Sequence, residues 1–236
     1  MNRSEATSII GSGLSQTSKM PCYSFNLSAL HCRTGSKLVK IKGSVCYGCY
    51  ALKGNYARYK HPINMKPKTE KINHPLWVPS MVYLINHQGN QRDKRYFRWH
   101  DSGDIQNLEH LKKIAKVCKL TPEVKHWLPT REYKIVRDFL FWESFPDNLT
   151  VRLSAHMIDQ KAPKVIECQT STVNKNKSAF GINCNSYRTN KDGKVLSEKA
   201  FQGLAKQEKT DEDLGHCGEC RLCWDKSIDN ISYKYH

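Results

Sequence analysis

The cysteines of this chain form two groups whose spacing is typical of metal ligands. Near the C-terminus, Cys217, Cys220 and Cys223 are three residues apart, so one tight loop can bring their thiolates together on an iron–sulfur cluster or a zinc ion. Near the N-terminus, Cys46 and Cys49 form a second closely spaced pair. Cysteines rarely fall at such spacings by chance, and the sequence therefore predicts metal ligation at both places.

The surroundings of other cysteines extend both groups. Cys184 lies in a polar, loop-like segment and is the predicted fourth ligand of the C-terminal group. Cys32 is predicted to join the N-terminal pair in preference to Cys22. Cys118 lies on the apolar face of a predicted helix and Cys168 stands alone, so both are expected to be buried apolar side chains.

The same residues leave alternatives open. Cys46 and Cys49 can form a redox dithiol, but that motif needs a preceding strand, and none is evident before Val45. The spacing does not distinguish iron–sulfur from zinc, although three loop cysteines with little histidine nearby favour iron and sulfide. It also leaves open whether the two groups hold separate clusters or share one.

The composition favours a reducing compartment. The chain has 236 residues and ten cysteines, and neither a signal peptide nor a membrane-spanning run is evident in it. We therefore expect a cytoplasmic protein without a membrane partner, in which disulfides are disfavoured. The formal net charge of +16 would attract a small anion or nucleic acid, but the basic residues are scattered, as on an ordinary solvated surface.

Polar side chains follow three predicted strands, at residues 96–100, 126–128 and 149–153. They are Asp101, Ser102 and Asp104 after the first strand, Thr130 and Arg131 after the second, and Ser154 and His156 after the third. Ligands bind to α/β sheets at the carboxyl ends of the strands, so these residues predict one shared pocket. In it, Arg131 can hold the carboxylate or phosphate of a small anionic ligand. Helix capping is the alternative role for Asp104 and Thr130.

The elements that position these residues alternate between strand and helix. Apolar residues recur at helical spacing over 108–118 and 135–140, and further helices are expected over 47–59 and from residue 75. Short strands are expected near 171–173 and 179–182. The alternation implies parallel strands with right-handed crossovers, which predicts an α/β fold, a partial TIM-like barrel with cysteine-rich loops at both ends. We expect residues 1–20 to be a disordered tail and residues 21–236 to form a single iron–sulfur domain.

Together these segments resemble the gene-product-88 family of bacteriophage proteins. The matching segments are 25–29 with Cys32, 43–54, 96–104, 127–133, 151–156 and 216–225, in the order of the family. The resemblance implies a phage protein that works in the cytoplasm of a bacterial host cell.

The N-terminal cysteines before a βα array also resemble, more loosely, those of radical S-adenosylmethionine enzymes. In that family three cysteines hold a [4Fe–4S] cluster and leave one iron for the cofactor. The spacing here departs from the compact CxxxCxxC of the family, and Gly48 stands where the family has an aromatic residue. The resemblance implies a site-differentiated cluster on Cys32, Cys46 and Cys49, a second cluster on Cys184, Cys217, Cys220 and Cys223, and binding of S-adenosylmethionine.

We therefore expect an iron–sulfur protein, specifically a radical-SAM-like or redox enzyme that acts on a small anionic substrate. The alternative is a module without catalysis, in which zinc or a cluster stabilises the loops and the basic surface binds nucleic acid.

Overall fold

The computed structural model describes residues 1–53, 68–165, 168–176, 180–197, 200–201 and 214–235. A seven-stranded sheet runs through them, and all of its strands are parallel. In spatial order, the strands are β1 (Tyr23–Phe25), β2 (Tyr96–Trp99), β3 (Lys125–Thr130), β4 (Leu149–Ser154), β5 (Gln169–Asn174), β7 (Asn230–Lys234) and β6 (Ile182–Asn183). The sheet is open, with β1 and β6 at its two edges.

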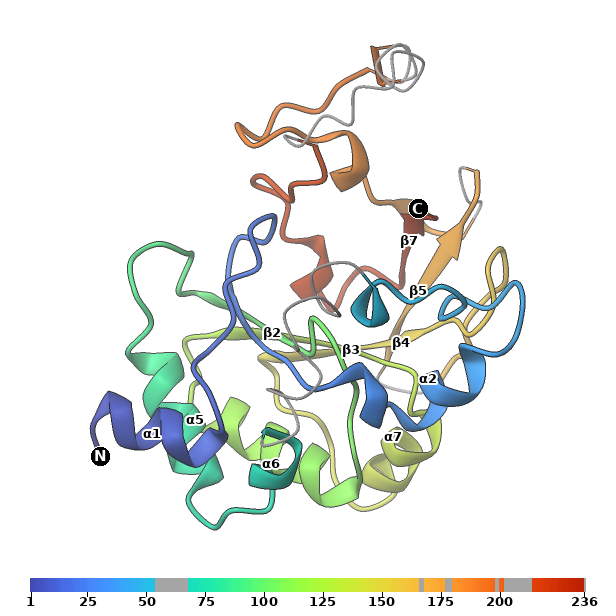
Figure 1. Cartoon of the computed structure of the whole chain (residues 1–236). Helices are drawn as coiled ribbons and strands as arrows, with labels where there is room; N and C mark the ends of the chain where they lie inside the picture. The colour runs from blue at the N-terminus through green and yellow to red at the C-terminus, as the bar shows by residue number, and fades with distance from the viewer. Residues whose placement is uncertain (54–67, 166–167, 177–179, 198–199, 202–213, 236) are drawn as a thin grey trace.

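Helices and 3-10 turns lie between these strands or precede them. The helices are α1 (Arg3–Ile10), α2 (Arg33–Leu38), α5 (Trp77–Asn86), α6 (Leu108–Lys119) and α7 (Tyr133–Leu140), with 3-10 turns η1 (Ala29–His31), η2 (Tyr50–Leu52), η3 (Ser186–Arg188) and η4 (Leu222–Trp224). Helices α5, α6 and α7 each connect two neighbouring strands, and right-handed connections that advance in one direction place their helices on the same face. Figure 1 shows α1, α5, α6 and α7 on one side of the sheet and the C-terminal segment with η4 on the other.

Helix α6 forms where the sequence combines a cap with an apolar stripe. The side chain of Asn107 accepts a hydrogen bond from the backbone N–H of His110 at 2.8 Å, which satisfies a donor in the first turn. Leu111, Ile114 and Cys118 recur at helical spacing and are fully buried in the main core. Cys118 is therefore a core residue, as predicted. Among the described residues, no helix is long and apolar enough to span a membrane.

The structure confirms the predicted α/β class and the parallel strands. The strands expected at 96–100, 126–128 and 149–153 are β2, β3 and β4. The helices expected from residue 75, over 108–118 and over 135–140 are α5, α6 and α7. The strand expected near 171–173 is β5. Of the strand expected over 179–182, only Ile182 is in a strand, at the start of β6, and residue 179 lies outside the described residues.

Other segments differ from the predictions. The tail expected to be disordered contains α1, in which Asn2 and Glu5 form a capping box and Ala6 and Ile10 are buried. Of the helix expected over 47–59, the described part forms only η2, and residues 54–59 lie outside the described residues. Strands β1 and β7 are not predicted. β1 has only three residues, all buried, so it lacks the alternation that reveals a half-exposed strand.

Arg152, in β4, fastens the C-terminal loop to the sheet. Its fully buried guanidinium donates hydrogen bonds to the carbonyl oxygens of Leu222 (3.0 Å), Cys223 (3.0 Å), Asp225 (2.7 Å) and Ile228 (2.8 Å). In the same loop, the buried indole of Trp224 donates to the carbonyl of Phe97 at 2.8 Å. Burial lowers the pKa of Arg152, but an arginine remains charged in proteins, so carbonyl dipoles must stabilise this cation.

Replacing Arg152 should therefore destabilise the fold strongly. Arg152→Met leaves several buried carbonyls without donors, and we expect the free energy of unfolding to fall by about 3–5 kcal/mol. Arg152→Lys keeps the charge but has fewer donors in a less suitable geometry, so its loss should be smaller. Urea denaturation measures both. The control is Arg137→Met, at an exposed position of α7, which should change the stability by less than about 0.5 kcal/mol. A loss for Arg152→Met as small as that of the control would contradict this role.

Candidate functional site

The N-terminal thiol group (Cys32, Cys46 and Cys49) lies in two short turns. Cys32 is the N-cap residue of α2, and the backbone N–H of Cys49 donates to the carbonyl of Cys46 at 3.0 Å across a turn that contains Gly48. Gly48 has a φ of +82°, which favours glycine and explains the departure from an aromatic residue here.

A glycine keeps open a small space between two of these thiols. A Cβ placed on Gly35 would lie 3.6 Å from the Sγ of Cys32 and 3.8 Å from the Sγ of Cys46, and only 2.9 Å from the Cβ of Cys32. Both sulfurs therefore border the same space, and any larger residue at position 35 would fill it. The predicted association of Cys32 with Cys46 agrees with this arrangement.

The ends of β3 and β4 hold these turns in place. The carboxylate of Glu132 accepts hydrogen bonds from the backbone N–H (2.8 Å) and the hydroxyl (3.0 Å) of Thr34, in the first turn of α2. The backbone N–H of Val45 donates to the carbonyl of His156 at 2.9 Å. In the sequence, Glu132 stands with Thr130 and Arg131 in the polar group that follows a predicted strand, but its contact with α2 joins distant segments and no local pattern reveals it.

The polar residues predicted at the ends of β2 and β3 meet through Asp104. Its buried carboxylate accepts hydrogen bonds from the Thr130 hydroxyl (2.6 Å), the Arg131 backbone N–H (2.9 Å) and the Ile105 backbone N–H (2.8 Å). Burial raises the pKa of Asp104 to about 6, against these hydrogen bonds, which favour the charged form. Asp104 and Thr130 are thus joined to each other across the strand ends.

The other predicted pocket residues have different roles. Asp101 accepts from the Ser24 hydroxyl at 2.8 Å, and its second carboxylate oxygen is buried without a hydrogen-bond partner among the described residues. Ser102 donates to the Leu27 carbonyl at 2.9 Å, which joins the β2 end to the segment after β1. The hydroxyl of Ser154 accepts from Ser171 at 3.0 Å.

His156 and Arg131 lie near the segment that carries Cys46, since the His156 carbonyl binds Val45 and the His156 ring contacts the Arg131 carbonyl. The ring of His156 stacks on Tyr133 with centroids 4.3 Å apart, and its Nε2 lies 3.3 Å from the Arg131 carbonyl. The Nε of Arg131 is buried and has no hydrogen-bond partner among the described residues. Burial raises the pKa of Cys46 and the Arg131 charge lowers it. Burial also raises the pKa of Cys32, and Asp104 raises it further. Thiols, guanidinium and carboxylate therefore belong to one site.

The C-terminal thiol group (Cys184, Cys217, Cys220 and Cys223) is assembled by β6, β7 and the loop that Arg152 binds. The backbone N–H of Cys184 donates to the Ser232 carbonyl at 2.8 Å, and the Sγ of Cys223 lies 3.1 Å from the Tyr233 hydroxyl. Burial raises the pKa of Cys217 to about 11 and that of Cys223 to about 12, and Cys184 raises both further. Cys220 also raises the pKa of Cys217, so all four predicted ligands lie near one another, three of them at least partly buried.

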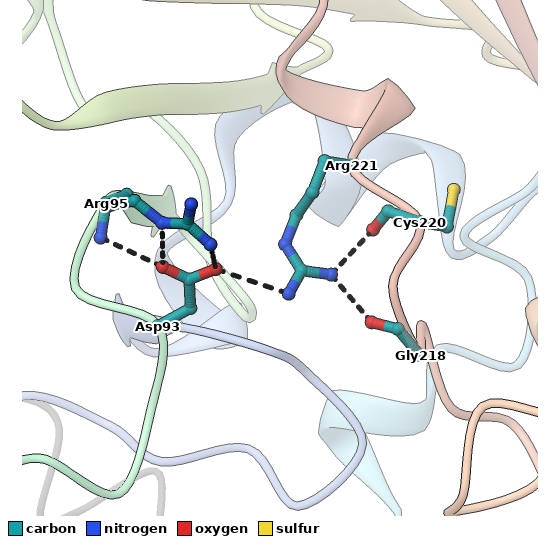
Figure 2. Close-up of polar contacts among 5 residues, drawn as sticks. All are labelled: Asp93, Arg95, Gly218, Cys220 and Arg221. Atoms are coloured by element: carbon teal, nitrogen blue, oxygen red, sulfur yellow. Dashed lines mark hydrogen bonds and ion pairs between the residues drawn. The ribbon is translucent and has the colours of Figure 1, made fainter.

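Cys220 is the exception, because its side chain is exposed. Arg221 fixes the loop around it, donating to the carbonyl oxygens of Gly218 (2.6 Å) and Cys220 (3.0 Å) and to Asp93 (3.3 Å). Asp93 also holds the guanidinium of Arg95 with two contacts of 2.9 Å. In Figure 2 the sulfur of Cys220 points away from these contacts.

The donor chemistry of both groups suits a soft metal centre. Within the described part of the chain, no three His, Cys, Asp or Glu side chains lie close enough together to hold a single metal ion. One zinc ion needs its sulfur ligands within about 2.3 Å, whereas a four-iron cluster distributes its thiolates over several metal atoms. Cys168, like Cys118, is part of the main apolar core, in agreement with the sequence.

The bond between Glu132 and Thr34 generates a prediction that needs no metal. Glu132→Ala removes the hydrogen bonds that hold the first turn of α2. This should lower the free energy of local opening around Cys32 by about 1–3 kcal/mol, so Cys32 should react with iodoacetamide at least about fivefold faster. The reaction is followed by peptide mass spectrometry with a chelator present. The exposed Glu123→Ala serves as control and should leave the rate unchanged, and Cys118 should stay protected throughout. Equal rates in both variants would contradict the positioning role.

Comparison with known proteins agrees with the resemblance seen in the sequence. No curated protein and no solved structure matches the chain. A family model described as gene product 88 matches residues 2–226, nearly the whole chain and both thiol groups. The chain therefore belongs to the gene product 88 family.

Proposed function

We propose that this protein binds a [4Fe–4S] cluster at Cys32, Cys46 and Cys49 and acts as a radical-SAM-like or redox enzyme on a small anionic substrate. The observation that carries the proposal is that the turns with these thiols are hydrogen-bonded to the residues just beyond β3 and β4, where Asp104 also binds the backbone of Arg131. Three thiols with a neighbouring cation and carboxylate provide both cluster ligands and groups that bind a polar molecule.

The order of the strands supports a partial barrel. Strands β1 to β5 are neighbours in chain order, and their connecting helices share one face, as in a segment of a TIM-like barrel. In such folds the reacting groups gather at the carboxyl ends of the strands. The N-terminal thiol group lies at that end, since Val45 bonds to His156 just beyond β4 and Thr34 bonds to Glu132 just beyond β3.

Different residues of this chain would hold the cluster and bind the external molecule. Cys32, Cys46 and Cys49 would hold three irons of a [4Fe–4S] cluster, which when bound would supply an electron and an open coordination position for a molecule such as S-adenosylmethionine. Arg131, whose Nε has no hydrogen-bond partner among the described residues, would hold the carboxylate of that molecule. Asp104 fixes the backbone of Arg131 through its N–H, and His156, stacked on Tyr133, contacts the Arg131 carbonyl.

The metal assignment is tested by anaerobic purification with iron and sulfide analysis and electron paramagnetic resonance. We expect Cys46→Ser to lose the iron of one cluster and Cys118→Ala, a matched buried cysteine, to retain all of it. Stoichiometric zinc without sulfide would favour the metal-stabilised module that binds nucleic acid. Full iron and sulfide in Cys46→Ser would remove this residue from the ligands.

The anion site is tested separately with Arg131→Ala. The loss of a charge-assisted hydrogen bond, about 1.5–3 kcal/mol, should weaken S-adenosylmethionine binding by tenfold or more without changing the iron content. Arg137→Ala, an exposed arginine of the following helix, is the control and should bind normally. A short RNA is titrated in parallel at several salt concentrations. If Arg131→Ala binds S-adenosylmethionine normally and its affinity for RNA depends less on salt, the nucleic-acid module is favoured. If Arg131→Ala loses iron, Arg131 has a structural role.

A further inference from the structure

Cys22 lies beside the C-terminal thiol group, although almost two hundred residues separate them in sequence. It directly precedes β1, is fully buried, and belongs to a small cluster with Trp127 and Trp224 against which Cys223 also packs. Two residues earlier, the Sδ of Met20 lies 3.8 Å from the Sγ of Cys217. The segment before β1 thus reaches two cysteines of the group.

Backbone contacts fix this approach. The backbone N–H of Cys217 donates to the carbonyl of Lys19 at 3.2 Å, and the Lys19 ammonium donates to the carbonyl of Leu214. The backbone N–H of Asp93 donates to the Pro21 carbonyl at 2.8 Å, while the Asp93 carboxylate binds Arg221. Residues 19–22 and 214–221 are therefore held together directly and through Asp93, next to the contacts that Figure 2 shows.

The electrostatics place the same thiols together. Burial raises the pKa of Cys22 to about 12, Arg98 lowers it, and Cys217 raises it further. After burial, the largest effect on the pKa of Cys217 is a rise caused by Cys184. The pKa of Cys223 is raised by burial and also by Cys184 and Cys217. Cys217 is thus linked electrostatically to Cys22, Cys184, Cys220 and Cys223, and of these four only Cys220 is exposed.

Positive charge surrounds this set of thiols. The guanidinium of Arg98 lies over Trp127 at 4.8 Å, and the Nε atoms of Arg98 and Arg221 are buried with no hydrogen-bond partner among the described residues. Buried donors without acceptors are costly, so they indicate an anionic occupant nearby. A cluster with four thiolate ligands carries negative charge and accepts hydrogen bonds at its sulfurs.

We propose that Cys22, Cys184, Cys217 and Cys223 are the four ligands of a second iron–sulfur cluster, and that Cys220 is not a ligand. The inference rests on the proposed binding of iron and sulfide and replaces Cys220 in the ligand set expected from the sequence. With four protein ligands this cluster has no open iron, so it transfers electrons or stabilises the fold and leaves substrate binding to the N-terminal thiol group.

The first experiment uses the unchanged, iron-loaded protein and iodoacetamide under anaerobic, native conditions. Cys220 should be alkylated quickly while the iron content stays constant, as followed by peptide mass spectrometry and iron analysis. Protection of Cys220 that disappears when a chelator removes the iron would overturn the proposal. A loss of iron at the same rate as the alkylation of Cys220 would also overturn the proposal.

The second experiment compares Cys22→Ala, Cys220→Ala and Cys118→Ala in the full chain. Cys22 and Cys118 are equally buried, so Cys118→Ala controls for the cost of packing. We expect Cys22→Ala to lose about half of the iron and sulfide, and both other variants to retain all of it. If Cys220→Ala loses iron and Cys22→Ala retains it, this inference is overturned but the proposed function is not. Absence of iron and sulfide from the unchanged protein would instead overturn the proposed function and this inference with it.

Discussion

The hydrogen bonds of Arg152 are the interaction on which the far face of the sheet depends. A charged guanidinium in β4 is stable there only because loop carbonyls between Leu222 and Ile228 surround it. Two of those carbonyls, of Cys223 and Ile228, need the arginine in turn, because within the described part of the chain their hydrogen bonds come from Arg152. This mutual requirement fixes Cys223 and Trp224 over the strands, and with them the part of the loop that carries Cys217.

The parallel sheet provides a second constraint, since every strand ends at the same edge. Asp104, Glu132 and His156 come from turns after three different strands, yet all three hold residues next to the N-terminal thiol group. The cysteines themselves lie in short turns with few apolar residues. Their positions are therefore set by the sheet edge, through the bonds of Glu132 to Thr34 and of His156 to Val45.

The sequence was sufficient for features that local patterns reveal. The apolar stripe of α6 and the aromatic run of β2 identified the βα units, and the polar residues after Trp99 and Leu128 identified side chains that meet at the strand ends. Contacts between distant segments left no such pattern. The segment with Lys19 and Met20 contacts Cys217 only because β1 joins the sheet, and β1 is too short and too buried to be recognised. The even spacing of Cys217, Cys220 and Cys223 also concealed that the side chain of Cys220, in a turn with Gly218 at a φ of +52°, is exposed.

The distance in sequence between the two ends of the C-terminal contact also affects how the protein is made. Residues 32–156 contain the N-terminal thiol group and the strand ends that support it, so this half can fold while the ribosome is still adding later residues. Cys217 and Arg221 follow about sixty residues later, a delay of several seconds at ordinary rates of translation. Until then Arg152 lacks its carbonyl partners and Cys22 lacks its neighbours. During synthesis, the contacts around the N-terminal thiol group can therefore form before those around the C-terminal thiol group.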